Sequence, residues 1–289
     1  KSEETWISEI NELLDDAVRL RLRSDVPFGA FLSGGVDSSS VVGYMSKHMK
    51  QPVNTYCIGF DDPKYDESPF AQEAAIRFET NHKTEIVEAN LLKHWPMATY
   101  HCDQPHGDVS FLPTYRVAKL AAQDVKMVLT GDGADELFAG YDKYKYFFAD
   151  EFVSNCTNEQ FVQAYAENIS LFGEKRLKEV LSKSVLDKIE NNNQYIDKVY
   201  GVLDEVPHMD RINKALYLDT QLLLSGNNLV KPDRMGMAVS IENRAPFLDY
   251  RVIEHAFSMP GELKLNKGET KYIYKKAVSQ LIGDNLAYR

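Results

Sequence analysis

The first 150 residues alternate between short apolar segments and segments with helical periodicity. Residues 28–35 (FGAFLSGG) are apolar and end in glycine, as a buried parallel strand does, and residues 38–49 then have helical spacing. Further strands are predicted at 52–60, 82–88 and 126–131, and further helices at 5–23, 68–79, 111–123 and 135–148. This alternation predicts an α/β fold with an open parallel sheet that helices cover on both faces.

Beyond about residue 150 the strand pattern stops. Residues 151–172, 174–190 and 212–224 all have the spacing of helices. We therefore expect one domain over residues 1–289, with an α/β part over about 1–150 and a helical part over about 151–289.

Composition and charge exclude several classes of protein. The formal net charge is −10, and the only tight basic cluster, at Arg19, Arg21 and Arg23, is flanked by acids, so no nucleic-acid partner is expected. No apolar run approaches the length of a membrane span, and the N-terminus lacks the apolar core of a signal peptide. Three widely spaced cysteines form neither a disulfide framework nor a zinc pattern, which favours the cytoplasm.

The first predicted strand runs into the sequence SGGVDSS at residues 33–39. In an open parallel sheet, ligands bind beyond the carboxyl ends of the strands. Glycine lets the backbone approach a ligand closely, and amides at the start of the following helix, with the nearby serine hydroxyls, can bind an anion. The segment therefore indicates a phosphate-binding loop. The alternative is a tight strand-to-helix turn capped by Ser and Asp.

An aspartate inside this loop distinguishes it from the usual nucleoside-triphosphate loop. That loop carries Gly-Lys-Ser/Thr, whereas this one has no lysine, and Asp37 stands where phosphate would repel it. A carboxylate is compatible with phosphate there if Mg²⁺ lies between the two groups. We therefore expect Mg²⁺ to bind together with the phosphates.

The segment SGGVDSS resembles the pyrophosphate loop, or PP-loop, of the N-type ATP pyrophosphatases, whose sheet is of the adenine-nucleotide α-hydrolase-like type. Two more segments narrow the resemblance to the asparagine synthetase family, and specifically to its C-terminal synthetase domain. Residues 128–141 (VLTGDGADELFAGY) place three acids after a strand, and residues 240–250 (SIENRAPFLDY) resemble a third family segment. A capped, solvated helix start is the alternative interpretation of the acids. Glu242 and Arg244 are expected to form an ion pair with a structural role.

The resemblance implies a set of site residues. Asp132 is the expected catalytic residue, and Asp37 and Asp135 are the expected ligands of Mg²⁺. The residues expected to bind ATP are Leu32, Ser33, Gly34, Gly35, Asp37, Ser38, Ile58 and Gly131. Leu32 and Ile58 are expected to offer backbone groups to the adenine.

The family also implies a reaction. A synthetase of this type adenylates a carboxylate, by default L-aspartate, and ammonia from a glutaminase domain then displaces AMP. That glutaminase domain is absent from this chain, which begins at Lys1 and is expected to start inside a longer one. A homodimer is possible. Two alternatives are an amidotransferase or β-lactam synthetase-like cyclase with another acceptor, and a non-catalytic nucleotide-binding subunit.

Two departures from the family pattern bear on these alternatives. Asn227 and Asn228 stand near a place where the family often has an acid, and an amide cannot supply charge to hold an amine. The family also continues into a basic loop whose lysine contacts the α-phosphate, and Arg289 is the first residue of that loop at most. Residues 1–289 alone are therefore expected to be poorly active.

Overall fold

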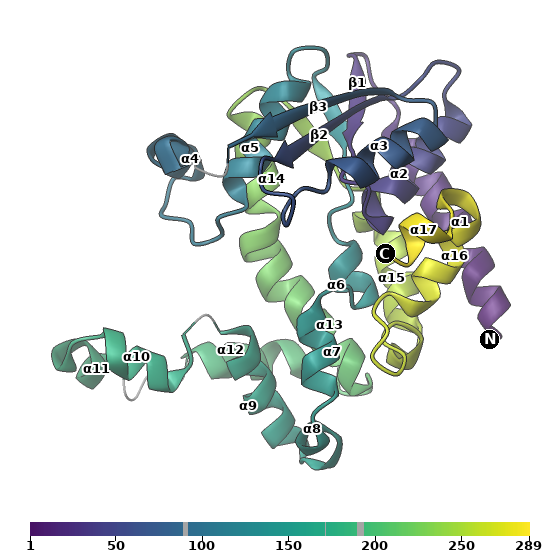
Figure 1. The fold of residues 1–289 in the computed structure, drawn as a ribbon. Helices are drawn as coiled ribbons and strands as arrows, with labels where there is room; N and C mark the ends of the chain where they lie inside the picture. Colours follow the sequence, from purple (N-terminus) through teal and green to yellow (C-terminus); the bar gives the residue numbers. More distant parts are fainter. Residues whose placement is uncertain (89–91, 171, 190–193) are drawn as a thin grey trace.

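The centre of the molecule is an open sheet of five parallel strands, which confirms the α/β fold of the adenine-nucleotide α-hydrolase-like type (Figure 1). The computed structural model describes residues 1–88, 92–170, 172–189 and 194–289. The strand order is β3-β2-β1-β4-β5, and all neighbouring strands are parallel. The strands are β1 (Phe28–Phe31), β2 (Asn54–Phe60), β3 (Asn81–Val87), β4 (Met127–Leu129) and β5 (Glu242–Arg244).

The edge strand β5 has no counterpart among the predicted strands, and the expectation that strands stop near residue 150 is wrong. The strand is only three residues long and polar, so it carries no hydrophobic alternation. Backbone pairing with β4 defines it instead. The predicted ion pair is confirmed: Arg244 Nε lies 2.7 Å from Glu242 Oε1, and the guanidinium also donates to the carbonyl oxygens of Arg21 and Arg23. Arg244 therefore fastens the edge strand to the N-terminal helix.

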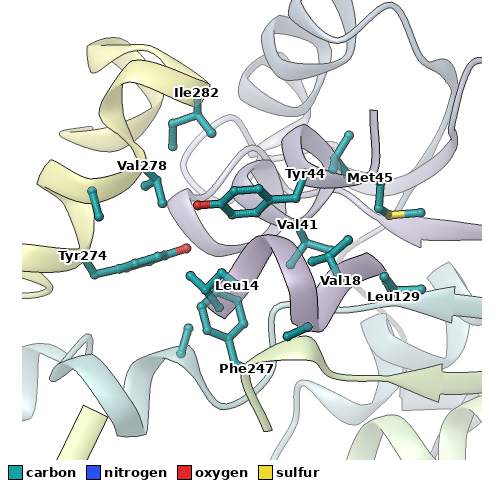
Figure 2. Close-up of a cluster of buried hydrophobic side chains, with 14 of the residues drawn as sticks. Leu14, Val18, Val41, Tyr44, Met45, Leu129, Phe247, Tyr274, Val278 and Ile282 are labelled. Atoms are coloured by element: carbon teal, nitrogen blue, oxygen red, sulfur yellow. The ribbon is translucent and has the colours of Figure 1, made fainter. Parts of the chain in front are cut away.

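One face of the sheet is covered by helices from both ends of the sequence. Here α1 (Glu3–Arg21), α2 (Val36–His48) and α3 (Ser68–Arg77) pack with α15 (Tyr250–Ser258), α16 (Tyr272–Ile282) and α17 (Asp284–Ala287). Figure 2 shows part of this core, in which Leu14, Tyr44, Phe247 and Tyr274 are all buried. The Tyr274 hydroxyl lies 2.6 Å from Ser40 Oγ, so its polar end has a partner inside the core.

The opposite face carries α4 (Trp95–Cys102), α5 (Phe111–Ala121) and α14 (Val230–Met237). Helix α5 packs on β2, and α14 packs on α5, so a second layer of apolar side chains closes the sheet on this side. The short 3₁₀ turns η1 (Leu92–His94), η3 (Pro246–Leu248) and η4 (Gly261–Leu263) connect these elements.

A separate helical region extends below the sheet in Figure 1. It consists of α7 (Asp142–Phe148), α8 (Glu151–Asn155), α9 (Asn158–Ile169), α10 (Glu174–Val180), α11 (Lys183–Ile189), α12 (Gln194–Asp204) and α13 (Arg211–Asp219). Its core is aromatic and includes Tyr144, Phe161 and Tyr165. The division of the sequence near residue 150 stays a prediction. Within the described ranges, no helix combines the length and the apolar character needed to cross a bilayer.

Four predicted helices are interrupted, and one of them, the segment 151–172, divides into α8 and α9. The segment 135–148 divides into α6 (Ala134–Phe138) and α7, because Ala139 adopts a left-handed conformation with φ of 57° and ends the first helix. The segment 174–190 likewise divides into α10 and α11. The segment 212–224 passes into a π-helix, η2 (Thr220–Asn228), which leads directly into α14.

Candidate active site

The main cleft lies at the point in the sheet where the chain connections reverse direction. The chain leaves β1 for β2 and β3 on one side and returns to β4 on the other, so β1 and β4 flank a topological switch point. A cleft of about 660 Å³ opens at the carboxyl ends of these two strands. Its walls come from the loops after β1 and β4 and from α5, α7, η2 and α14.

The loop after β1 is held in shape by its own hydroxyl groups. The Ser33 and Ser38 hydroxyls lie 3.1 Å apart, the Ser33 backbone N–H donates to Ser38 Oγ, and the Gly35 N–H donates to Ser33 Oγ. Helix α2 begins at Val36, so Asp37 lies in its first turn and its N-terminus faces the cleft. The N-terminus of α2 therefore lies at the cleft, where a helix can bind an anion, and phosphate binding by this loop stays a prediction.

The two glycines of this loop have different surroundings. Gly34 has a φ of 75°, and a Cβ atom there would overlap the backbone of Phe70 at the start of α3. Gly35 lines the cleft, and a Cβ atom would meet nothing closer than 3.4 Å, at Ser33 Oγ and Arg289 Nη2. Gly34 is thus needed by the fold, whereas Gly35 leaves room on the side where a ligand can enter.

The loop after β4 lies directly against the start of α2. A Cβ atom on Gly131 would stand 2.8 Å from Asp37 Cβ, so only glycine allows this approach. The structure thereby brings Asp37, Asp132 and Asp135 into one cleft with the serine-glycine loop. Most of the predicted site residues line this cleft: Ser33, Gly35, Asp37, Ser38, Gly131, Asp132 and Asp135.

Leu32 and Ile58 do not belong to the walls of this cleft. The Leu32 N–H donates to the carbonyl oxygen of Tyr56 within the sheet, at 2.9 Å, which leaves the carbonyl group of Leu32 as its available backbone group. The Ile58 side chain packs into the apolar layers under α5. The expected contact of these two residues with adenine stays a prediction.

Lys271 joins the two aspartates expected to bind metal. Its Nζ atom lies 2.6 Å from Asp37 Oδ2 and 2.7 Å from Asp135 Oδ1, and its side chain is only 8% exposed. Burial acts to lower the pKa of Lys271, but the two carboxylates outweigh it and raise that pKa. Sequence reasoning missed this residue, because it comes from the start of α16, far along the chain.

Asp132 lines the same cleft as Asp37 and Asp135. Its Oδ2 atom accepts a hydrogen bond of 2.7 Å from the Thr130 hydroxyl. Burial raises the pKa of Asp132, although the Thr130 hydrogen bond and the charge of Lys231 act in the other direction. A raised pKa makes this carboxylate a stronger base than an exposed aspartate.

Glu136 is held by neutral groups. It is buried, and its Oε1 accepts hydrogen bonds of 2.7 Å from both the Tyr141 hydroxyl and Asn228 Nδ2. Burial raises the pKa of Glu136 despite these donors. Asn228, at the place where the family often has an acid, therefore does not face solvent as a free acid would. Its amide donates to Glu136, and the neighbouring Asn227 donates to Asn228 Oδ1.

Two lysines on the far walls of the cleft also escaped sequence reasoning. Lys231 Nζ lies 3.0 Å from Asp108 Oδ2 and donates to Ser110 Oγ. Lys143 Nζ lies 2.7 Å from Asp219 Oδ2, which is fully buried in the helical core. Both lysines thus line the cleft and are already paired with carboxylates.

The family model for asparagine synthase matches residues 9–289. The chain belongs to the asparagine synthase family. This finding confirms the resemblance seen in the three sequence segments, and the matched residues include those that line the cleft.

Relatives of this asparagine synthase-family chain are larger proteins. The chain is 30% identical to asparagine synthetase 1 (glutamine-hydrolyzing) of Bacillus subtilis, over 99% of its own length and 49% of the relative. It is 27% identical to amidase chyE of Penicillium rubens, over 99% of its length and 52% of that protein. A putative asparagine synthetase 2 of Methanocaldococcus jannaschii is 45% identical over 47% of the chain. The chain spans about half the length of the curated relatives that it matches throughout.

The synthase-family cleft has an oxygen atom suited to a cation. Asp37 Oδ1 is buried and has no hydrogen-bond partner. Magnesium in nucleotide sites takes one or two carboxylates and completes its shell with phosphate oxygens and water. Among the described residues no group of three or more His, Cys, Asp or Glu is placed to hold a metal. That Asp37 and Asp135 bind Mg²⁺ together with phosphates stays a prediction.

Arg289 lies beside the serine-glycine loop. Its guanidinium lies 2.9 Å from Glu67 Oε1 and 4.5 Å from the centre of the Phe70 ring, at the start of α3. The charge is therefore fixed close to Gly35, on the side of the cleft where phosphates would lie.

Proposed function

We propose that this chain is the synthetase part of an ATP-dependent amidotransferase, which adenylates a carboxylate and transfers ammonia to it. The default acceptor is L-aspartate, the product is then asparagine, and AMP and pyrophosphate are released. The observation that carries the proposal is the meeting of the serine-glycine loop and the acidic loop, including Asp132, in one cleft at the switch point, where Lys271 pairs with Asp37.

In this proposal the backbone amides and hydroxyls of residues 33–38, with Gly131, bind the phosphates of ATP. Asp37 and Asp135 hold Mg²⁺, which would neutralise charge on the phosphate oxygens as pyrophosphate leaves. The free Oδ1 of Asp37 and the position of its helix N-terminus support these assignments.

The reaction has two steps. An oxygen of the acceptor carboxylate attacks the α-phosphorus, and the bond to the β-phosphate oxygen breaks, which gives an acyl-adenylate and pyrophosphate. Ammonia then attacks the acyl carbon, AMP leaves with the electron pair of its oxygen, and Asp132 accepts the proton that nitrogen loses. The raised pKa of Asp132 supports its role as this base.

The substitution Asp132→Asn tests the second step. Loss of a general base typically lowers a rate by about 10²–10⁴-fold, so amide formation should fall by that factor. The adenylation step should persist, because no proton is lost when the acceptor carboxylate attacks the α-phosphorus. Exchange of labelled pyrophosphate into ATP measures the first step, and amide yield measures the second. Unchanged amide yield would show that Asp132 only caps its helix, and cleavage of ATP to ADP would contradict the whole assignment.

The glycine pair gives a matched test of ATP binding. In Gly35→Val the side chain fills the ligand side of the loop while the fold has room for it, so ATP affinity should fall at least about tenfold at an unchanged melting temperature. In Gly34→Val the clash with Phe70 should lower the melting temperature itself. Calorimetric titration with ATP, together with thermal unfolding, distinguishes the two. Full ATP affinity in folded Gly35→Val would count against the phosphate loop.

A second acceptor class keeps its place beside aspartate. Relatives that match 99% of the chain include one named an amidase, which supports keeping acceptors other than aspartate in the proposal. In the described cleft, on the side proposed for the acceptor, Asp108 is already paired with Lys231. Glu136 there already accepts hydrogen bonds from Tyr141 and Asn228. Pyrophosphate exchange across a panel of carboxylic acids identifies the acceptor. The glutaminase domain that would supply ammonia, and a homodimer, remain part of the proposal.

A further inference from the structure

The ammonium group of Lys271 occupies the position between the two carboxylates of the proposed metal site. It contacts Asp37 Oδ2 at 2.6 Å and Asp135 Oδ1 at 2.7 Å. The residue is fixed by its backbone, since its N–H donates to the carbonyl oxygen of Phe138 and its φ is 53°. A Cβ atom on Gly140 would overlap both Asp135 and Lys271, so the contact is closely packed.

A metal ion and this ammonium need the same oxygen atoms. In the nucleotide-free protein Asp37 Oδ1 is, of the four oxygens, the one that is buried without a hydrogen-bond partner. A divalent ion that approached it would meet a positive charge already bound to the other oxygen of the same carboxylate. Because the lysine is part of the chain, its effective concentration at the carboxylates is far above that of free Mg²⁺ in solution.

We infer that Lys271 is a positioning residue that acts as an internal cation: it holds Asp37 and Asp135 together when no metal is bound, and it prevents binding of free Mg²⁺. The triphosphate supplies the negative charge that lets metal and ammonium occupy the site together. Mg²⁺ therefore enters only with its nucleotide. The inference rests on the proposed function solely in taking Asp37 and Asp135 as the metal ligands.

The experiment measures Mg²⁺ binding by the nucleotide-free protein, using calorimetric titration at low salt. Lys271→Met keeps a long side chain and removes the charge, so it should bind Mg²⁺ at least about tenfold more tightly than the parent protein. Lys271→Arg retains a cation and should stay a weak binder. The double variant with Asp37→Asn should lose the gain. Lys276→Met, which removes another lysine of α16 and its ion pair with Glu3, is the control.

Thermal unfolding with and without Mg²⁺ covers the case in which Lys271→Met folds poorly. Mg²⁺ should then restore its fold, because the metal takes the place of the ammonium, and it should not change the melting temperature of the parent protein. Equal Mg²⁺ affinity in Lys271→Met and the parent, or no rescue of an unfolded variant, would overturn the inference. Because these measurements involve no turnover, they are independent of pyrophosphate exchange, whose absence for every acid would instead overturn the proposed function.

Discussion

A lysine is buried at the strand-end cleft, and another is buried at the junction between α13 of the helical region and α15. The two environments shift the pKa of the lysine in opposite directions. In the cleft, Lys271 contacts the carboxylates of Asp37 and Asp135, and its pKa is raised. At the junction, Lys264 is fully buried, donates to Asn213 Oδ1 at 2.7 Å and lies 4.7 Å from the centre of the Phe257 ring. Burial lowers the pKa of Lys264 to about 7.

The difference shows that the partner, more than burial, decides whether a buried amine stays charged. Two carboxylates compensate the desolvation of Lys271, whereas an amide oxygen and an aromatic face compensate that of Lys264 only in part. The cleft is therefore built to keep a fixed charge, and the junction holds a lysine that can lose its proton near neutral pH.

The largest effect is expected when the cleft loses its cation. Lys271→Met leaves two carboxylates facing each other without a counter-charge, and breaking such a buried pair typically destabilises a protein by about 3–5 kcal/mol. Denaturant unfolding in metal-free buffer measures this. The half-buried pair of Lys276 and Glu3 near the surface provides the comparison, since Lys276→Met should change the free energy of unfolding by less than about 1 kcal/mol. Equal effects of the two substitutions would show that Lys271 contributes no more to stability than Lys276 does.

A smaller effect, visible as a dependence on pH, is expected at the junction. The unfolded chain binds a proton at Lys264 up to its ordinary pKa of 10.5, whereas the folded protein releases it above about 7. The free energy of unfolding should therefore rise with pH between these values, by at most about 1.4 kcal/mol per pH unit. Lys264→Met should lack this rise. Parallel pH profiles for the parent and Lys264→Met between pH 7 and 10 would contradict the prediction.

The smallest effect is expected at Glu136, whose partners in the cleft are neutral. Glu136→Gln keeps an oxygen acceptor for Tyr141 and Asn228, so the free energy of unfolding should change by no more than about 1 kcal/mol. Glu136→Ala instead leaves two donors unpaired and should be destabilising by about 1–3 kcal/mol. Chemical denaturation of both variants tests this. If Glu136→Gln lowered the free energy of unfolding as much as Lys271→Met does, the charge of Glu136 would also have to be balanced by a cation.

The sequence predicts the parts of the site that lie within short segments. The serine-glycine loop and the acidic loop each follow an apolar strand, and parallel pairing of β1 and β4 is enough to bring Asp37 and Asp135 together. The glycine spacing carries this information locally, because Gly34 and Gly131 permit close backbone contacts that other residues would block. Family resemblance adds the expected roles, and the geometry is compatible with them.

Long-range partners could not be predicted in the same way. Lys271 precedes a helix and has no pattern that marks it as a partner of Asp37, which lies 234 residues earlier. Strand β5 is polar and three residues long, and backbone hydrogen bonds alone define it. The π-helix that presents Asn228 to Glu136 likewise follows from tertiary packing and leaves the helical periodicity of its sequence intact.

The long span between Asp37 and Lys271 also has a consequence for synthesis of the protein. Both acidic residues leave the ribosome well before Lys271, and translation of the intervening chain takes on the order of ten seconds. During that time the two carboxylates have no ammonium between them, so the nascent loops repel one another. The cleft is therefore expected to form late, and a chain that stalls before residue 271 should be unable to hold the serine-glycine loop and the acidic loop together.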